Sequence, residues 1–181
     1  MDAIRNLIDL LEAKKTLELK DLPYAQGDLA PVLSADSIKF HFGTLARNYV
    51  KRFNAGEGDA DFNAAGAFLH NTLFEQFRAP TDKNTPSEAV MDFVSHHFDN
   101  YRNFQNQFEA AAMPIQGSGW VYLARSGRIK TIRNHEIRDD IVLLVDWWEH
   151  SFQPDYGSDK KSYLNNIWKI INWPVIADRL K

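Results

Sequence analysis

The stretch that decides the fold of this chain is IVLLVDWWEH, residues 141–150. Its first half, Ile141–Val145, is a short continuous apolar run, which predicts a buried strand. Asp146 and His150 follow at a spacing of four positions. If the segment is helical, or turns into a helix at the strand end, both side chains lie on one side and can reach one ion. Trp148 stands between them in the sequence and is placed to exclude water. We therefore expect a buried strand that leads into a candidate metal site.

Two further β-type segments precede this strand. Trp120–Ala124 and Ile129–Ile132 flank the turn sequence RSGR at 125–128, which is the arrangement of a β-hairpin. Together with Ile141–Val145 they predict a small three-stranded antiparallel sheet. The tripeptide Gly-Ser-Gly at 117–119 marks the entry to it.

Most of the remaining chain is predicted to be helical. Ser34 is placed to cap the first helix of the body, and Asn54–Asp61, with its glycines and acids, predicts a tight connection to the second. The expected helices are Asp36–Phe53, Phe62–Phe77, Glu88–Phe98, Tyr101–Ala112, Trp147–Phe152 and Ser162–Ile171. Helices come first and a small antiparallel sheet with flanking helices follows, so the predicted fold class is α+β.

Composition excludes several classes of function. The 181 residues carry 21 Lys+Arg against 24 Asp+Glu, without a dense basic run, so nucleic acid and anionic membranes are not expected partners. The absence of cysteine excludes disulfides, thiolate catalysis and cysteine-ligated metals. No apolar run reaches the roughly 18 residues of a membrane span, and no signal-peptide pattern opens the chain, which predicts a soluble cytoplasmic protein.

Histidine and carboxylate are therefore the candidate metal ligands. His96 and His97 are neighbours on one predicted helix and cannot share a face, so we assign them structural or surface roles. His41 and His70 each lie inside a predicted helix beside a stripe of apolar residues. Burying an imidazole in such a core costs free energy unless its nitrogen is bound to something. The alternative is that each is an ordinary hydrogen-bonded structural histidine. The predicted ligand set is His41, His70, Asp146 and His150, which would hold a transition metal and leave one position open.

Six motifs, in this order, resemble the iron/manganese superoxide dismutase family over nearly all of residues 19–180. They are DLPYA at 21–25, FHFG at 40–43, FNAAGAFLH at 62–70, QGSGW at 116–120, DWWEH at 146–150 and NIWKIINW at 166–173. The resemblance implies a helical hairpin domain over residues 19–86 and an α+β domain over 87–181, with the metal site between them. Residues 1–18 would then be an extra N-terminal helix, which docks on the body or on a partner; a targeting peptide is the weaker interpretation.

The resemblance also implies an activity and a set of roles. The protein would be an antioxidant oxidoreductase that converts superoxide to dioxygen and hydrogen peroxide at one iron or manganese ion per chain. Its ligands would be the same four residues, with Tyr49 at the mouth of the substrate funnel. Trp120 and Trp148 would be aromatic walls, and Phe74 stands where the family usually has Trp. Glu149 would reach the other subunit's ligand histidine, which predicts a homodimer through Glu149 and His150.

The residue that would tune the reduction potential of the metal differs from those usual in the family. Iron-type members often place a Gln four residues before the second ligand, where this chain has Gly66. Manganese-type members often place a Gln after the hairpin, where His135 stands. His135 is therefore expected to hydrogen-bond the coordinated solvent, the alternative being a plain surface-loop histidine. Because neither diagnostic Gln is present, the choice between iron and manganese stays open, as does that between dimer and tetramer.

Other departures keep a second hypothesis open. Leu45 and Ala46 replace the histidines that usually follow the first ligand, and Gln153 replaces a tyrosine that contacts one of them across the dimer. The connection at Asn54–Asp61 is shorter than in relatives. The chain could accordingly be a non-enzymatic interaction protein on the same scaffold, using residues 1–15 as a partner helix.

Overall fold

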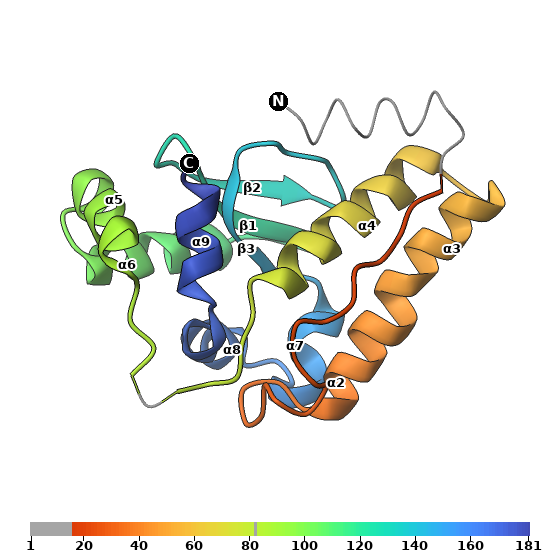
Figure 1. The fold of residues 1–181 in the computed structure, drawn as a ribbon, viewed down its shortest axis with the longest axis horizontal. Helices are drawn as coiled ribbons and strands as arrows, with labels where there is room; N and C mark the ends of the chain where they lie inside the picture. The colour runs from red at the N-terminus through yellow and green to blue at the C-terminus, as the bar shows by residue number, and fades with distance from the viewer. Residues whose placement is uncertain (1–15, 82) are drawn as a thin grey trace.

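The computed structural model describes residues 16–81 and 83–181, and it confirms the predicted α+β class. The helices are α2 (Ala35–Phe40), η1 (His41–Ala46), α3 (Arg47–Ala55), α4 (Ala60–Glu75), α5 (Glu88–Phe98), α6 (Tyr101–Ala112), α7 (Glu149–Tyr156), α8 (Lys160–Ile167), η2 (Trp168–Ile170) and α9 (Trp173–Arg179). The strands are β1 (Gly119–Ala124), β2 (Ile129–Arg133) and β3 (Ile141–Asp146). In Figure 1 the helical hairpin of α3 and α4 lies at one end, α5 and α6 lie at the other, and the sheet is between them.

The hairpin is built from capped helices. The Ser34 side chain accepts a hydrogen bond from the Ser37 amide and starts α2, as predicted. The expected single helix Asp36–Phe53 is interrupted, because η1 is a π-helical turn that begins at His41. Such widened turns are frequent at functional sites. Gly56, with φ of 68°, ends α3, and the Asp59 side chain caps α4, so the connection is as tight as expected.

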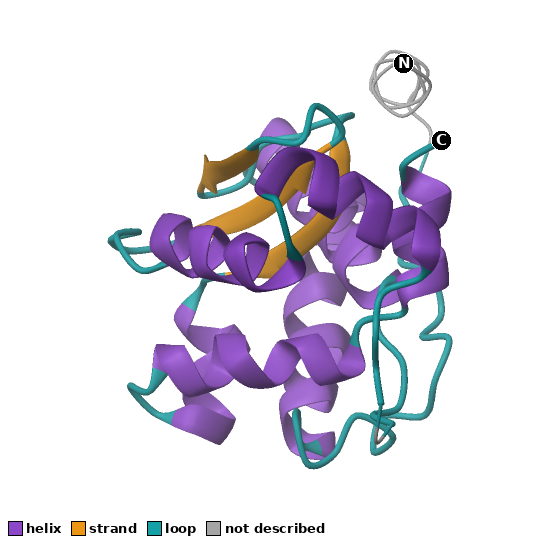
Figure 2. Cartoon of the chain, turned by 90° about the vertical axis from the view of Figure 1, so that its left-hand side faces the viewer, coloured by secondary structure: helices purple, strands orange, loops and turns teal. Residues whose placement is uncertain are grey.

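The sheet has the order β2-β1-β3, and both pairings are antiparallel. Every residue of β1 and β3 is buried, whereas β2 is partly exposed. Figure 2 shows the strands as one curved layer with helices packed beside it. Helix α6 contacts β1 and β2, while α4 and α9 contact β3. In the register Trp120 lies directly opposite Asp146, which brings an aromatic wall next to a predicted ligand.

The chain after β3 corrects two predictions. The helix expected at Trp147–Phe152 begins only at Glu149, because the Trp147 amide still bonds to Gly119 of β1 and prolongs the extended backbone. The helix expected at Ser162–Ile171 ends in the short turn η2, since Ile171 is extended and forms a β-bridge with Phe77. A separate helix, α9, then follows.

The predicted helix at residues 1–18 falls almost entirely outside the described residues. Residues 16–18 are not helical. Leu17 is held on the hairpin by a pair of hydrogen bonds with the Asn54 side chain, of 2.8 and 2.9 Å. Within residues 16–81 and 83–181, no helix has both the length and the apolar character needed to cross a membrane.

Candidate metal centre

Four side chains from four elements meet between the hairpin and the sheet. His41 comes from η1, His70 from α4, Asp146 from the end of β3 and His150 from the first turn of α7. Each offers one ligand atom, and these atoms all lie within 4.8 Å of one another. These are the four residues that the sequence nominated, and the structure brings all of them together.

The three imidazoles converge on one carboxylate oxygen. The Nε2 atoms of His41, His70 and His150 lie 3.1, 3.9 and 3.3 Å from Asp146 Oδ2. His70 and Asp146 are fully buried, and His41 is nearly so. Among the described residues, none of these four atoms has a hydrogen-bond partner. Buried polar atoms are normally paired, so four converging unpaired ones indicate that something else is bound between them.

Local contacts set the orientation of two of these side chains. His70 Nδ1 lies 2.7 Å from the Gly66 carbonyl oxygen, which can only accept, so Nδ1 carries the proton and Nε2 presents its lone pair. The other carboxylate oxygen of Asp146, Oδ1, accepts a 2.8 Å bond from the Trp148 amide. The Asp146 carbonyl accepts bonds from the hydroxyls of Ser151 and Tyr163, at 3.0 and 3.1 Å.

The charges at the site suit a cation. Burial lowers the pKa of His41, and it lowers the pKa of His70 well below its usual value, so both imidazoles are neutral near pH 7. Burial by itself raises the pKa of Asp146, but the surrounding histidines outweigh it and hold that pKa well below its usual range. Two neutral imidazoles and one ionised carboxylate oxygen that converge in a dry pocket form a donor set for a cation. Nitrogen and oxygen donors of this kind fit iron or manganese.

Aromatic rings enclose the cluster. The ring centroid of Phe74 lies 5.0 Å from that of His41, and Trp120 lies 5.2 Å from His70. Tyr49 lies 5.3 Å from His70, and Trp148 lies 5.6 Å from His150. Trp120 and Phe74 are buried, whereas Tyr49 and Trp148 are half-buried. The predicted walls Trp120 and Trp148 therefore lie beside the cluster, and Trp148 reaches toward the surface, as does Tyr49.

His135, from the loop after β2, also reaches this pocket. Its ring stacks on Trp148 at 4.7 Å and meets Tyr49 at 4.8 Å. The indole N–H of Trp120 donates to the Asn134 carbonyl at 2.9 Å and to His135 Nδ1 at 3.3 Å. Because an indole can only donate, Nδ1 is the acceptor and Nε2 carries the proton. Burial lowers the pKa of His135 to about 4, so the ring is neutral at pH 7.

Comparison with known proteins agrees with this geometry. Residues 16–67 match the alpha-hairpin domain of the iron/manganese superoxide dismutases, and residues 86–179 match the C-terminal domain of the same enzymes. This chain belongs to the iron/manganese superoxide dismutase family.

Its relatives include enzymes named for iron and one named for manganese and iron. The superoxide dismutase [Fe] of Bacteroides fragilis is 30% identical, over 91% of this chain and 100% of the relative. The superoxide dismutase [Fe] of Salmonella typhimurium is 29% identical over 91% of this chain and 98% of the relative. The superoxide dismutase [Mn/Fe] of Porphyromonas gingivalis is 29% identical over 91% of this chain and 99% of the relative. The family resemblance inferred from the motifs is thus confirmed.

Sequence reasoning missed two contacts of this dismutase site. From the sequence, Gly66 is notable only because it stands where iron-type members of the family often have a Gln. In the structure a Cβ at Gly66 would stand 2.8 Å from Cγ of Tyr49, so only glycine lets the ring lie against α4. Phe62, on the same helix, meets His135 at 4.6 Å and was also missed. Neither contact has a sequence signal, since each joins residues whose elements meet only in the fold.

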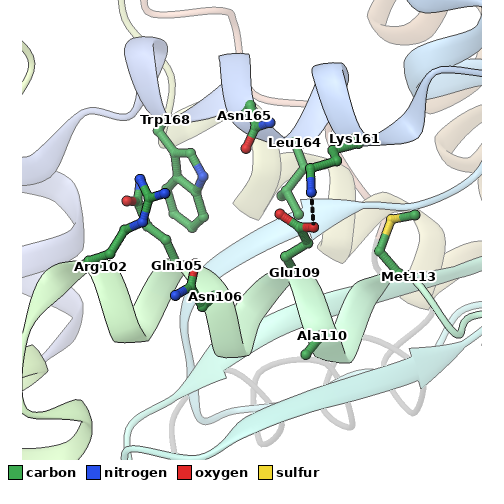
Figure 3. A pocket seen from close by; sticks show the side chains of 10 residues that line it. All are labelled: Arg102, Gln105, Asn106, Glu109, Ala110, Met113, Lys161, Leu164, Asn165 and Trp168. Carbon is green, nitrogen blue, oxygen red and sulfur yellow. Dashed lines mark ion pairs between the residues drawn. The ribbon is translucent and has the colours of Figure 1, made fainter.

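Three of the surface hollows among the described residues bear on where a ligand could enter. A hollow of about 570 Å³ is lined by residues that include Phe40, Trp148, Glu149, His150 and Lys160, so it reaches the least buried of the four converging side chains. Another, of about 390 Å³, is lined by residues that include Phe62 and His135. A third, of about 730 Å³, lies between α6 and α8, where Lys161 pairs with Glu109 at 2.8 Å (Figure 3). This third hollow contains none of the predicted site residues.

Proposed function

We propose that His41, His70, Asp146 and His150 hold one iron or manganese ion, and that the chain uses it as a superoxide dismutase. The observation that carries the proposal is the convergence of three imidazole nitrogens on one buried, ionised carboxylate oxygen, with no hydrogen bond to any of these atoms among the described residues. The site lies between the helical hairpin layer, residues 19–86, and the α+β layer, residues 87–181. The retention of all four ligands favours the enzyme over the interaction-protein alternative.

The chemistry supplied by the metal is one-electron exchange, by which one superoxide becomes dioxygen and a second, with two protons, becomes hydrogen peroxide. Asp146 contributes the anionic ligand, whose charge favours the oxidised ion. His135 keeps a buried Nε2–H that has no partner among the described residues, so it is available as a neutral donor, because Trp120 occupies Nδ1. The Tyr49 ring contacts both His135 and His70, and Tyr49 holds its hydroxyl proton, since burial raises its pKa to about 12. Trp148 and Phe74 exclude bulk water from the ligands.

Reconstitution with each metal tests the proposal. The metal-free protein is loaded separately with iron and with manganese, the metal content is measured, and superoxide decay is followed. We expect about one ion per chain and catalysed decay with at least one metal. His70→Ala should lose both, whereas His96→Ala, which removes an exposed histidine on α5, should keep both. A protein that binds metal without accelerating superoxide decay would contradict the proposed activity.

We further propose a homodimer formed through the face that carries Glu149 and His150. Phe40 is 45% exposed at the hollow beside His150, and an exposed Phe next to an exposed carboxylate suits a self-complementary interface. Met113 is equally exposed, at 45%, and is absent from the residues that line this hollow, so it offers a matched control. Sedimentation should find that Phe40→Glu weakens the dimer and that Met113→Glu does not. A monomeric parent protein would refute this interface. The cytoplasmic location stays a prediction from the sequence.

A further inference from the structure

The outer edge of β3 is bonded by a side chain instead of by another strand. β3 is the last strand of the sheet, so one of its edges faces away from β1. There the Leu144 amide donates to Gln76 Oε1 at 3.1 Å, and Gln76 Nε2 donates to the Leu144 carbonyl. The Gln76 side chain is fully buried. Its amide therefore pairs with Leu144 as a neighbouring strand would, and both polar groups are satisfied.

Gln76 also joins this strand to two helices. It is the C-cap residue of α4, the helix that carries His70. Its Oε1 accepts a second bond from Arg179 of α9, at 3.1 Å. The guanidinium of Arg179 in turn donates to the Thr72 carbonyl at 2.8 Å. One buried amide thus fixes α4, β3 and α9 relative to one another.

The paired hydrogen bonds between the Gln76 side chain and the Leu144 backbone form a clamp. Its two ends, Gln76 at the end of α4 and Leu144 on β3, are close in the chain to His70 and Asp146. Leu144 precedes Asp146 by two residues of one strand, a rise of about 6.6 Å. Gln76 follows His70 by six residues, a rise of about 9 Å along α4. A strand and a helix transmit displacement over such short distances with little bending. A shift of β3 against α4 at Gln76 would therefore change the distance from His70 Nε2 to Asp146 Oδ2, now 3.9 Å.

We propose that Gln76 is a positioning residue of the metal centre, whose amide sets the separation of His70 and Asp146 and with it the coordination geometry. The inference rests on the proposed function, since it assigns a role toward the metal that these ligands hold. Gln76 does not touch the ligands itself and acts only through α4 and β3.

The test compares Gln76→Leu with Asn84→Leu, a variant that removes a similar set of side-chain hydrogen bonds away from the metal centre. Asn84 likewise bonds two backbone carbonyls through its side chain, those of Trp168 and Ile171, each at 2.9 Å, and neither partner belongs to an element that carries a ligand. Each variant is loaded with iron, and its electron paramagnetic resonance spectrum, its metal affinity by chelator competition and its melting temperature are recorded. Gln76→Leu should alter the spectrum and weaken metal binding about tenfold, the effect expected when support around ligands is lost. Asn84→Leu should lower the melting temperature only.

A second variant covers the case in which Gln76→Leu does not fold. Gln76→Glu keeps the shape and the acceptor for Leu144 and Arg179 but replaces the donor by an oxygen that the Leu144 carbonyl repels, so it should give a spectral change of the same kind. Spectra and affinities equal to those of the parent in a folded Gln76 variant would overturn the inference, and so would equal changes in Asn84→Leu. If instead the parent protein binds no iron or manganese, or binds it without activity, the proposed function itself fails.

Discussion

Replacing Gly66 by alanine tests whether the position of Tyr49 controls the site. The new Cβ would stand 2.8, 2.9 and 3.0 Å from three carbons of the Tyr49 ring. Non-bonded carbons prefer separations of about 3.5 Å or more, so the ring must move by roughly 0.7 Å, the difference between 3.5 and 2.8 Å. That ring contacts His70 and His135, so the displacement reaches both a ligand and the predicted tuning residue.

Two opposing terms decide the effect of Gly66→Ala on stability. Alanine in a helix interior is favoured over glycine by about 1 kcal/mol. Overpacking a filled site costs about 1–3 kcal/mol. The net free energy of unfolding should therefore stay unchanged or fall by up to about 2 kcal/mol. Catalysis should suffer more, because a 1 Å misplacement near reacting groups can cost about 100-fold in rate. We expect a loss of roughly tenfold or more, with metal content unchanged.

The assay needs a control for the change from glycine to alanine itself. Gly43 lies in η1, and a Cβ added there would have no neighbouring atom within 4 Å, so Gly43→Ala should be neutral or slightly stabilising and fully active. Urea unfolding, metal analysis and superoxide decay are measured on both variants. In a Tyr49→Ala background, Gly66→Ala should become stabilising because the clash is gone. Full activity in Gly66→Ala, or the same cost in both backgrounds, would refute the reasoning.

Three further outcomes are expected. Removal of the metal by a chelator should lower the melting temperature, and adding iron or manganese back at about 100 times its dissociation constant should restore about 2.7 kcal/mol; an unchanged melting temperature would argue against a structural contribution of the ion. The metal-free protein should lose stability as the pH falls from 7 to 5.5. The pKa values of His41, His70 and His135 are lowered in the folded protein, to about 4 for His135. Below about pH 6.5 the unfolded chain therefore binds more protons than the folded protein does. The loss is measured by urea unfolding and should be roughly 1.2 kcal/mol for His135 alone, with further losses from His41 and His70. A flat profile would contradict the burial of these histidines as neutral groups. Trp120→Phe removes the donor to His135 Nδ1, so nitrogen NMR should find a mixture of His135 tautomers in place of one, whereas persistence of a single tautomer would mean that another contact selects it.

Much of the fold could be predicted because periodicity and caps are local signals. Glu88–Phe98 and Tyr101–Ala112 are helices with the predicted bounds, and the hairpin and strand 141–145 were each found to within one residue at either end. The π-turn at His41 was not predicted, since apolar spacing does not distinguish it from an α-helix. The helix after β3 begins later than predicted because the Trp147 amide bonds to Gly119 of β1, a pairing that the local sequence around Trp147 does not reveal.

The candidate ligands could also be nominated from the sequence. Asp146 and His150 share one short segment, so their spacing was informative by itself. His41 and His70 required a different argument, the cost of turning an imidazole into an apolar core, and the family motifs strengthened it. For both pairs the information lay within a few residues of the ligand, and the structure brings all four together.

By itself, the sequence determined the fold class, the kind of metal-ligating side chain that was available and the four residues that converge, because these depend on composition and on short spacings. Only the tertiary structure decided how the site is supported. The Tyr49 ring has room because Gly66 faces it from another helix, and β3 is held by Gln76 across 68 residues of chain. Such contacts join elements whose separation in the sequence carries no periodic signal. They arise only when helices and sheet pack together and every buried polar group must find a partner.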